Sequence, residues 1–169
     1  MNILVVWASR HGATQEVADT VAEELTAAGH AVTIRPATDA PSPHVYDAVI
    51  LGSAVYMAQW EDSMRRYITS HHDALLDRAL WAFSVGLSGM PGGGIQDPVR
   101  VGPVLLKIQP REHKTFAGRL KPRELSLRER SIARLGGAVE GDFRDWQEIR
   151  QWAKNVASEC SRLKAGDED

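Results

Sequence analysis

Several features on which whole protein classes depend are scarce in this sequence. A single cysteine, Cys160, stands among 169 residues, which excludes an internal disulfide, a CxxC redox pair and a metal cluster held by cysteines. Its place in an apolar helical stripe favours a buried structural thiol. The six histidines show no metal-binding spacing, and the adjacent His71 and His72 would point apart on a helix. The sequence therefore predicts no metal site.

The chain also lacks a strong excess of charge of either sign. Its net charge of −2 gives no whole-molecule attraction to nucleic acid, and it does not predict the strongly acidic surface of many small electron carriers. No apolar run approaches the ~18 residues of a transmembrane helix. A strand pattern begins at Ile3, with no cleavable leader before it. We expect a cytoplasmic protein with no nucleic-acid partner and no membrane-spanning segment.

One stretch is nevertheless locally basic. Its six basic residues are Arg119, Lys121, Arg123, Arg128, Arg130 and Arg134. Such a stretch can meet the inner face of an anionic membrane, an acidic protein or a propionate-bearing substrate. It can equally be a solvated helix face, because Glu124 and Glu129 dilute its charge.

Strand and helix patterns alternate along the whole chain. Continuous or alternating apolar runs predict strands at 3–8, 31–35, 46–51, 79–85 and 115–120. Amphipathic spacing predicts helices at 17–28, 61–76, 98–108, 126–135 and after Asp142, which we expect to cap the last helix. Ser126 and Glu129 have the spacing of a capping box. We expect one domain over 1–163, followed by a frayed polar tail over 164–169.

This alternation predicts an α/β fold with helices on both faces of a five-stranded parallel sheet. Right-handed crossovers leave few topologies, of which the strand order 2-1-3-4-5 is favoured. A ligand in such a sheet lies at the carboxyl ends of the strands, beside the first one. The segments after the first, third and fourth strands are therefore the candidate binding loops.

The loop after the first strand suits a phosphate group. It consists of Ser9, Arg10, His11, Gly12, Ala13 and Thr14 and opens a helix, whose first N–H groups and dipole favour an anion. Gly12 permits close approach of the backbone, and the hydroxyls of Ser9 and Thr14 can donate hydrogen bonds. The alternative is an ordinary turn and helix cap. A Walker A loop, a three-glycine dinucleotide fingerprint and the acidic residues of a phospho-acceptor domain are all missing here.

The other two loops suit a flat ring. After the third strand, Tyr56 or Trp60 can stack on it, although both can instead pack against the adjacent helix. The candidate contacts in this loop are Ala54, Val55, Tyr56 and Met57. After the fourth strand, backbone amides can reach the polar edge of a flavin and stabilise its reduced form. The candidate contacts there are Ser84, Val85, Gly86, Leu87, Ser88 and Gly89.

These motifs resemble the phosphate and ring loops of flavodoxins over roughly residues 1–160. Within that superfamily the sequence is most similar to the branch containing menaquinone-dependent protoporphyrinogen IX dehydrogenase. The similar motifs are Ser9-Arg10-x-Gly12-x-Thr14, Gly52 to Tyr56, Phe83-Ser84-Val85, Ala117 to Leu120 and Asp145-Trp146. The resemblance implies a flavodoxin-like three-layer sandwich with an extra helical segment after strand 5, here 124–137. The loop departs from common flavodoxins in carrying Arg10-His11 in place of threonines, and 89–111 matches the porphyrinogen enzyme poorly.

By resemblance the cofactor is FMN, with its phosphate on the first loop and its ring between the other two. The main functional hypothesis is an FMN-dependent oxidoreductase whose substrate is a quinone, a porphyrinogen or a nicotinamide. The second is a non-enzymatic electron-transfer flavodoxin, and the third is a binding module that has lost the flavin. The sequence assigns neither catalytic residues nor an oligomeric state.

Overall fold

A computed structural model describes residues 1–86, 98–135 and 139–166 of the chain. Its strands are β1 Asn2–Ala8, β2 Ala31–Pro36, β3 Ala48–Tyr56, β4 Gln59–Trp60, β5 Ala79–Gly86, β6 Glu112–Ala117, β7 Arg119–Leu120 and β8 Gly141–Asp142. Its α-helices are α1 Ala13–Ala27, α2 Asp62–Ser70, α3 His72–Leu76, α4 Pro98–Ile108, α5 Leu127–Leu135 and α6 Trp146–Gly166. Short 3-10 turns cover Pro43–Val45 and Pro122–Glu124.

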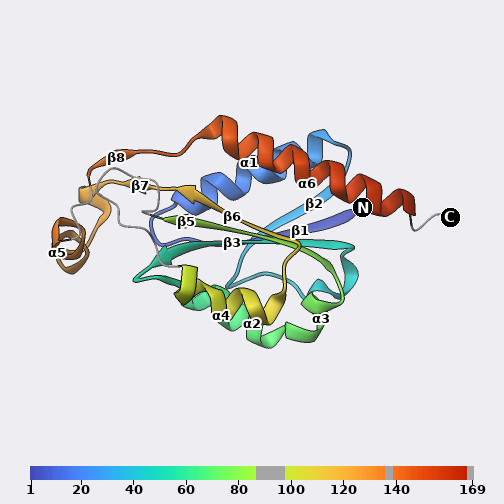
Figure 1. Ribbon diagram of the computed structural model, residues 1–169, viewed down its shortest axis with the longest axis horizontal. Coiled ribbons are helices and arrows are strands. Elements are labelled where there is room, and N and C mark those ends of the chain that lie inside the picture. The colour runs from blue at the N-terminus through green and yellow to red at the C-terminus, as the bar shows by residue number, and fades with distance from the viewer. Residues whose placement is uncertain (87–97, 136–138, 167–169) are drawn as a thin grey trace.

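The main sheet is parallel, in the order β2-β1-β3-β5-β6. This confirms the predicted order 2-1-3-4-5, because β4 is only a two-residue antiparallel extension of β3. Helices α1 and α6 cover one face of the sheet, and α2, α3 and α4 cover the other (Figure 1). The carboxyl ends of the strands therefore meet at one edge, where α5, β7 and β8 also lie.

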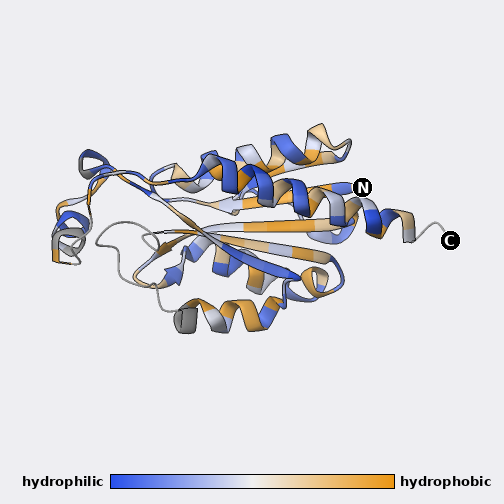
Figure 2. Cartoon of the chain, turned by 45° about the horizontal axis from the view of Figure 1, so that its top comes forward, coloured by the Kyte–Doolittle hydropathy of each residue, from blue (hydrophilic) through white to orange (hydrophobic). Residues whose placement is uncertain are grey.

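The first strand is buried on both faces, which explains its unbroken apolar run. Ile3 and Val5 pack in the cluster under α1 and α6, whereas Leu4 and Val6 pack in the cluster on the α2–α4 side. All four side chains are fully buried. The strands of the sheet are accordingly its most hydrophobic part, while the helices turn polar residues outward (Figure 2).

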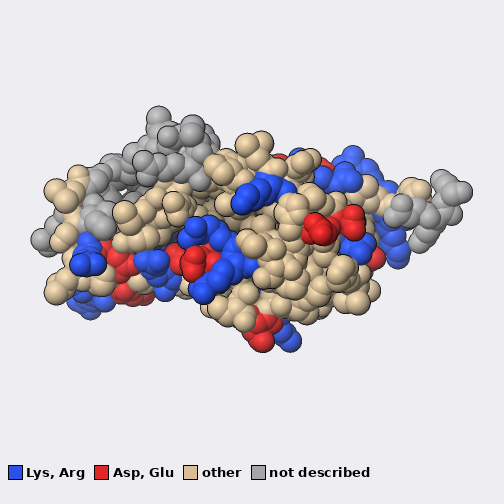
Figure 3. All heavy atoms as spheres, turned by 90° about the horizontal axis from the view of Figure 1, so that it is seen from below, with Lys and Arg blue, Asp and Glu red and all other residues tan. Residues whose placement is uncertain are grey.

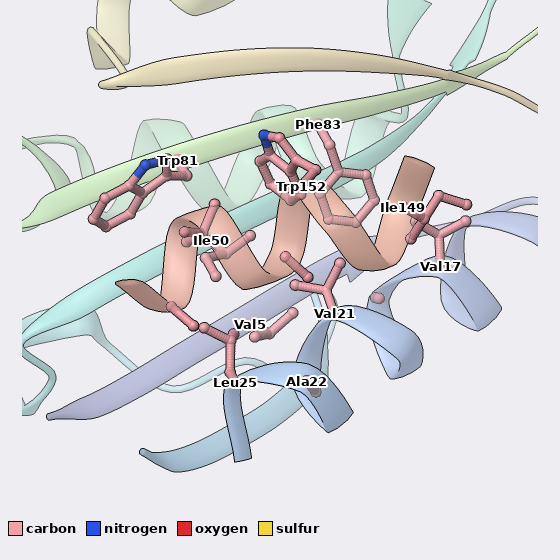
Figure 4. Packing of buried hydrophobic residues seen from close by; sticks show 14 of the residues in the cluster. Val5, Val17, Val21, Ala22, Leu25, Ile50, Trp81, Phe83, Ile149 and Trp152 are labelled. Carbon is pink, nitrogen blue, oxygen red and sulfur yellow. The ribbon is translucent and has the colours of Figure 1, made fainter. Parts of the chain in front are cut away.

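Aromatic side chains form the centre of the α1–α6 core (Figure 4). The ring of Trp152 makes edge contacts with Phe83 and Phe116, at centroid distances of 5.8 and 5.7 Å. Cys160 is fully buried in the same cluster, as predicted, and burial raises the pKa of its thiol to about 11. The cysteine is thus an unreactive part of the core.

Several predicted element boundaries are wrong. The first helix begins at Ala13 rather than at 17. The third strand runs over Ala48–Tyr56 rather than 46–51, so that Ala54, Val55 and Tyr56 belong to the strand and not to a loop after it.

The helix expected over 61–76 breaks at His71, whose φ of −124° is not helical, and becomes α2 and α3. The fifth strand of the main sheet runs over Glu112–Ala117 rather than 115–120. At Gly118 the chain leaves that sheet, so the last predicted residues form β7, which pairs with β8.

The start of the last helix also differs from the prediction. Asp145, not Asp142, caps α6 by accepting a hydrogen bond from the Glu148 N–H at 3.0 Å. Asp142 instead binds the guanidinium of Arg144. Helix α6 continues to Gly166, three residues into the predicted frayed tail, and 167–169 lie outside the described residues.

Gly52, near the carboxyl end of β3, is predicted to be intolerant of a side chain. It pairs with Phe83, and a Cβ at position 52 would lie 2.0 Å from Phe83 Cζ. We expect Gly52→Ala to lower the free energy of unfolding by about 1–3 kcal/mol, the usual cost of overpacking. Gly102→Ala in α4 is the control, because no atom lies within 4 Å of its added Cβ. Equal stability of the two variants by denaturant unfolding would contradict this packing.

Candidate functional site

The loop between β1 and α1 leaves backbone donors free at the carboxyl edge of the sheet. Gly12 precedes the helix with φ +80°, and no side chain caps α1. Within the described ranges, no acceptor receives a hydrogen bond from the N–H groups of residues 10–15. A Cβ at Gly12 would meet only Arg119 Nη2, at 3.9 Å. The loop is therefore an open cradle of donors at the positive end of a helix dipole, which suits an anion.

The two hydroxyls predicted to help this cradle differ in exposure. Thr14 is buried, with 1% of its surface exposed, whereas Ser9 is half-buried. Neither hydroxyl makes a hydrogen bond to the described residues, so both, like the backbone N–H groups of the loop, are available to a ligand.

Arg10 connects the predicted phosphate loop, residues 9–14, to the predicted ring loop, residues 54–57. Its guanidinium carbon lies 4.0 Å from the centroid of the Tyr56 ring, a cation–π geometry. Its Nε lies 3.2 Å from Glu61 Oε1 and its Nη1 lies 3.3 Å from Glu129 Oε1. One face of Tyr56 is therefore covered by an arginine whose charge two carboxylates balance.

Glu129 brings α5 onto the same loop. Its carboxylate accepts a hydrogen bond from the Ser126 N–H at 2.8 Å, while the Glu129 N–H donates to Ser126 Oγ at 3.3 Å, which confirms the predicted capping box. The same carboxylate lies 3.2 Å from His11 Nε2. Partial burial would raise its pKa, but hydrogen bonds from Ser126, His11 and Arg10 outweigh burial and lower the pKa to about 2. Glu129 is thus a carboxylate anion held against the side chains of Arg10 and His11.

The ring loop is a tight hairpin. Met57 and Ala58 form its two-residue turn between β3 and β4, with φ values of 48° and 61°. Positive φ at both central positions is the type I′ geometry that matches strand twist. Tyr56 is half-buried and Met57 is 67% exposed, so both border solvent at this edge. Met57 and Ala58 adopt left-handed backbone conformations that are strained for residues other than glycine, and such strain is common at functional sites.

Trp60 does not reach the site. It is 2% exposed, and its indole N–H donates to Ser84 Oγ at 2.8 Å, inside the core on the α2–α4 side. The alternative in which Trp60 stacks on a ring is therefore wrong, and Tyr56 is the aromatic residue of this loop that borders the edge.

The third loop is described only as far as Gly86. Ser84 and Val85 are buried at the end of β5, and Gly86 is half-buried; Leu87, Ser88 and Gly89 lie outside the described residues. Ser84 Oγ also lies 2.8 Å from His113 Nε2, and burial lowers the pKa of that imidazole. Trp60, Ser84 and His113 thus form a hydrogen-bonded line behind the ring loops.

A family profile for the flavodoxin domain matches residues 4–145. The chain belongs to the flavodoxin-domain family. This membership implies a flavin cofactor, whereas the narrower porphyrinogen dehydrogenase branch finds no separate support. No curated protein sequence matches the chain.

Solved structures place this flavodoxin-domain protein among flavodoxin folds. A flavodoxin from the domain Archaea shares 11% identity at a TM-score of 0.62, covering 94% of this chain and 98% of the other. Flavodoxin 1 from Bacillus cereus shares 16% identity at 0.57, over 90% and 95%. A flavodoxin, WrbA-like protein from Agrobacterium tumefaciens shares 14% identity at 0.59, over 95% and 98%. At these identities the likeness establishes the fold.

Surface charge, candidate metal ligands and helix hydrophobicity further describe this flavodoxin-domain protein. On the α2–α4 face, basic and acidic residues are interspersed, with no extended acidic surface among the residues described (Figure 3). No three His, Cys, Asp or Glu side chains of the described segments gather as metal ligands, and none of the helices described is long and apolar enough to cross a membrane.

The charge on Glu129 is predicted to stabilise the docking of α5. Because folding lowers its pKa from 4.5 to about 2, the stabilisation is complete above pH 4.5 and is lost as pH falls toward 2. Glu129→Gln keeps an acceptor for the Ser126 N–H but removes the charge. We expect it to lower the free energy of unfolding at neutral pH by about 0.5–1 kcal/mol, and to flatten the pH dependence between 2 and 4.5.

The control is Glu140→Gln, which removes an exposed carboxylate of the same segment. Denaturant unfolding curves across this pH range provide the measurement. A Glu129→Gln protein with the same pH profile as the wild type would contradict the ion pair with Arg10 and the hydrogen bonds to the Glu129 carboxylate.

Proposed function

We propose that this protein binds FMN non-covalently at the carboxyl edge of its sheet and transfers electrons, as a flavodoxin-type carrier. The observation that carries the proposal is the set of backbone N–H groups over residues 10–15 that have no acceptor among the described residues. They lie at the amino end of α1, at the topological switch point beside β1, where ligands bind in sheets of this order. The family supplies the identity of the ligand as a flavin.

The cradle fits a terminal phosphate. Its donors come from Arg10, His11, Gly12, Ala13 and Thr14, and Ser9 precedes them at the end of β1. The positive φ of Gly12 lets the chain turn from β1 into the helix in a conformation that glycine adopts without strain. In this proposal these residues bind the phosphate mainly through their amides.

The two other loops would hold the ring. Tyr56 offers an aromatic face, and Val55 and Met57 flank it on the hairpin. Ala54 continues β3 beside Val85, so that the half-buried Gly86 at the end of β5 would lie nearest the ring. Ser84 and Val85 are buried behind it, and Leu87, Ser88 and Gly89, which the sequence predicts at the polar edge of the flavin, lie outside the described residues. Bound FMN supplies the one- or two-electron redox chemistry, and the protein orients it and adjusts its potential.

A second candidate is a flavin-dependent oxidoreductase acting on a quinone, a porphyrinogen or a nicotinamide. The β7–α5–β8 segment favours it, because it lies at the carboxyl edge of the sheet, where the flavin would bind, and exposes Leu127 and Leu135 at 81% and 89%. An apolar, basic segment suits an organic or anionic substrate, or the inner face of a membrane, better than it suits a basic redox protein. The carrier is preferred because the family and the solved relatives are flavodoxins.

FMN binding tests the proposal directly. We expect the purified protein to show flavin absorption bands, or the apoprotein to quench FMN fluorescence on titration, with the released chromophore identified by mass. Gly12→Ala should weaken FMN binding by about tenfold, equivalent to about 1.4 kcal/mol, because a Cβ at φ +80° strains the cradle. A colourless protein that takes up no FMN would overturn the proposal.

The matched control is Gly29→Ala at the other end of α1. Gly29 has φ +88°, so alanine there incurs a comparable strain of about 1–2 kcal/mol. We expect it to lower stability while leaving FMN affinity unchanged. Equal loss of FMN affinity in both variants would show that helix stability, not the cradle, controls binding.

Steady-state assays separate the two candidate functions. The carrier predicts that the reduced protein is reoxidised by protein redox partners and only slowly by quinones, porphyrinogens or nicotinamides. Rapid turnover with one of these small molecules would instead establish the oxidoreductase.

A further inference from the structure

Two arginines, one in β7 and one just after β8, meet on one carboxylate of α1. Glu16, in the first turn of α1, lies with Oε1 2.7 Å from Arg119 Nη1 and with Oε2 2.8 Å from Arg144 Nη1. Asp142 binds Arg144 from the other side, at 2.6 and 2.8 Å. Both arginine side chains are largely enclosed, at 11% and 2% exposure. The hairpin of β7 and β8 is thereby fastened to the start of α1.

The same two guanidinium groups also bind the backbone of the phosphate loop. Arg119 Nη2 donates to the His11 carbonyl at 3.2 Å, and Arg144 Nη1 donates to the Ala13 carbonyl at 3.3 Å. These carbonyls belong to two peptide units on either side of the Gly12–Ala13 bond. The two arginines therefore bind the carbonyl oxygens of the loop and leave its N–H groups unoccupied.

Because the peptide units are planar, hydrogen bonds to these two carbonyls also set the direction of the N–H groups of the same peptide units. All described peptide bonds are trans, and in a planar trans peptide the C=O and the N–H point in opposite directions. A carbonyl of His11 held toward Arg119 directs the Gly12 N–H away from that arginine. In the same way, a carbonyl of Ala13 held toward Arg144 directs the Thr14 N–H away from it. The two arginines thus orient the N–H groups of Gly12 and Thr14 from the side of the loop opposite these N–H groups.

Net charge does not explain the arrangement. Glu16 and Asp142 balance the two guanidinium charges, so the cluster adds little attraction for an anion at a distance. What the cluster supplies is preorganisation, which lowers the entropic cost of ordering the loop around a ligand.

We infer that Arg119 and Arg144 are positioning residues that set the affinity of the loop for a terminal phosphate, and hence the preference for a phosphorylated over an unphosphorylated flavin. This inference rests on the proposed FMN site. It assigns to the inserted β7–β8 hairpin a role at the phosphate end of the ligand.

A comparison of FMN with riboflavin tests the inference, because the two differ only in the phosphate. We expect Arg119→Gln in the full chain to weaken FMN binding by about tenfold and to leave riboflavin binding within about twofold of the wild type. Arg119→Lys should fall between, since one ammonium cannot reach both the Glu16 carboxylate and the His11 carbonyl as a planar guanidinium does.

Arg150→Gln is the matched control. Arg150 binds Glu24 of the same helix α1 at 2.8 Å, far along the chain from the cradle. It should change neither affinity. Should Arg119→Gln fail to fold, Glu16→Gln loosens both arginines without removing them, and the same loss for FMN alone is expected.

Three outcomes overturn the inference. If Arg119→Gln, or Glu16→Gln in its place, binds FMN as tightly as Arg150→Gln, the arginines do not set phosphate affinity. If FMN and riboflavin lose affinity equally, the effect is general destabilisation. In both cases FMN binding by the wild type leaves the proposed function intact, whereas a wild type that binds neither flavin overturns that function and the inference together.

Discussion

The structure depends on one constraint: β1 is buried on both faces, and a short loop connects its carboxyl end to α1. Because the strand is enclosed by β2, β3 and helices on both sides, the turn that follows it has a fixed place at the carboxyl edge. The first N–H groups of a helix have no intrahelical acceptor. Here Gly12 leaves them uncapped by any side chain. The sheet thus creates an anion cradle as a consequence of how its central strand ends.

The chain from β7 to the start of α6 then contacts this cradle from two sides. From α5, Glu129 holds the side chains of Arg10 and His11. From β7 and the start of α6, Arg119 and Arg144 hold the carbonyls of the loop. The side chains that replace the usual threonines are therefore engaged with protein carboxylates. In the proposed FMN site, this segment supports the phosphate end as much as the ring end.

The sequence predicts much of the fold because local signals agree with the tertiary ones. The apolar run of β1, the capping box at Ser126 and the strand order all follow from short-range patterns and are confirmed. The break at His71 and the departure of the chain at Gly118 were not predictable in this way, since helix and strand patterns continue through them. Tertiary packing decides boundaries of this kind, and local secondary-structure propensity carries no information about that packing.

The candidate site divides along the same line. Its loops are predictable, because the topology requires them to meet. Its side-chain partners are not, since Arg10 and Glu129 are 119 residues apart in the chain, and His113 lies in a segment with no recognisable motif. Trp60 is the opposite case, a residue that the sequence proposed for the site and that the structure places in the core. An aromatic residue next to a loop signals either a ligand contact or a core position, and only its 2% exposure decides for the core.

Amide chemical shifts test the central claim most directly. In a two-dimensional ¹⁵N–¹H spectrum of the apoprotein titrated with FMN, the amide protons of residues 10–15 are predicted to move downfield together. Charge-assisted hydrogen bonds to phosphate would produce that movement. Inorganic phosphate should shift the same amides in the same direction. Shifts confined to other residues, with these amides unchanged at saturation, would contradict the account.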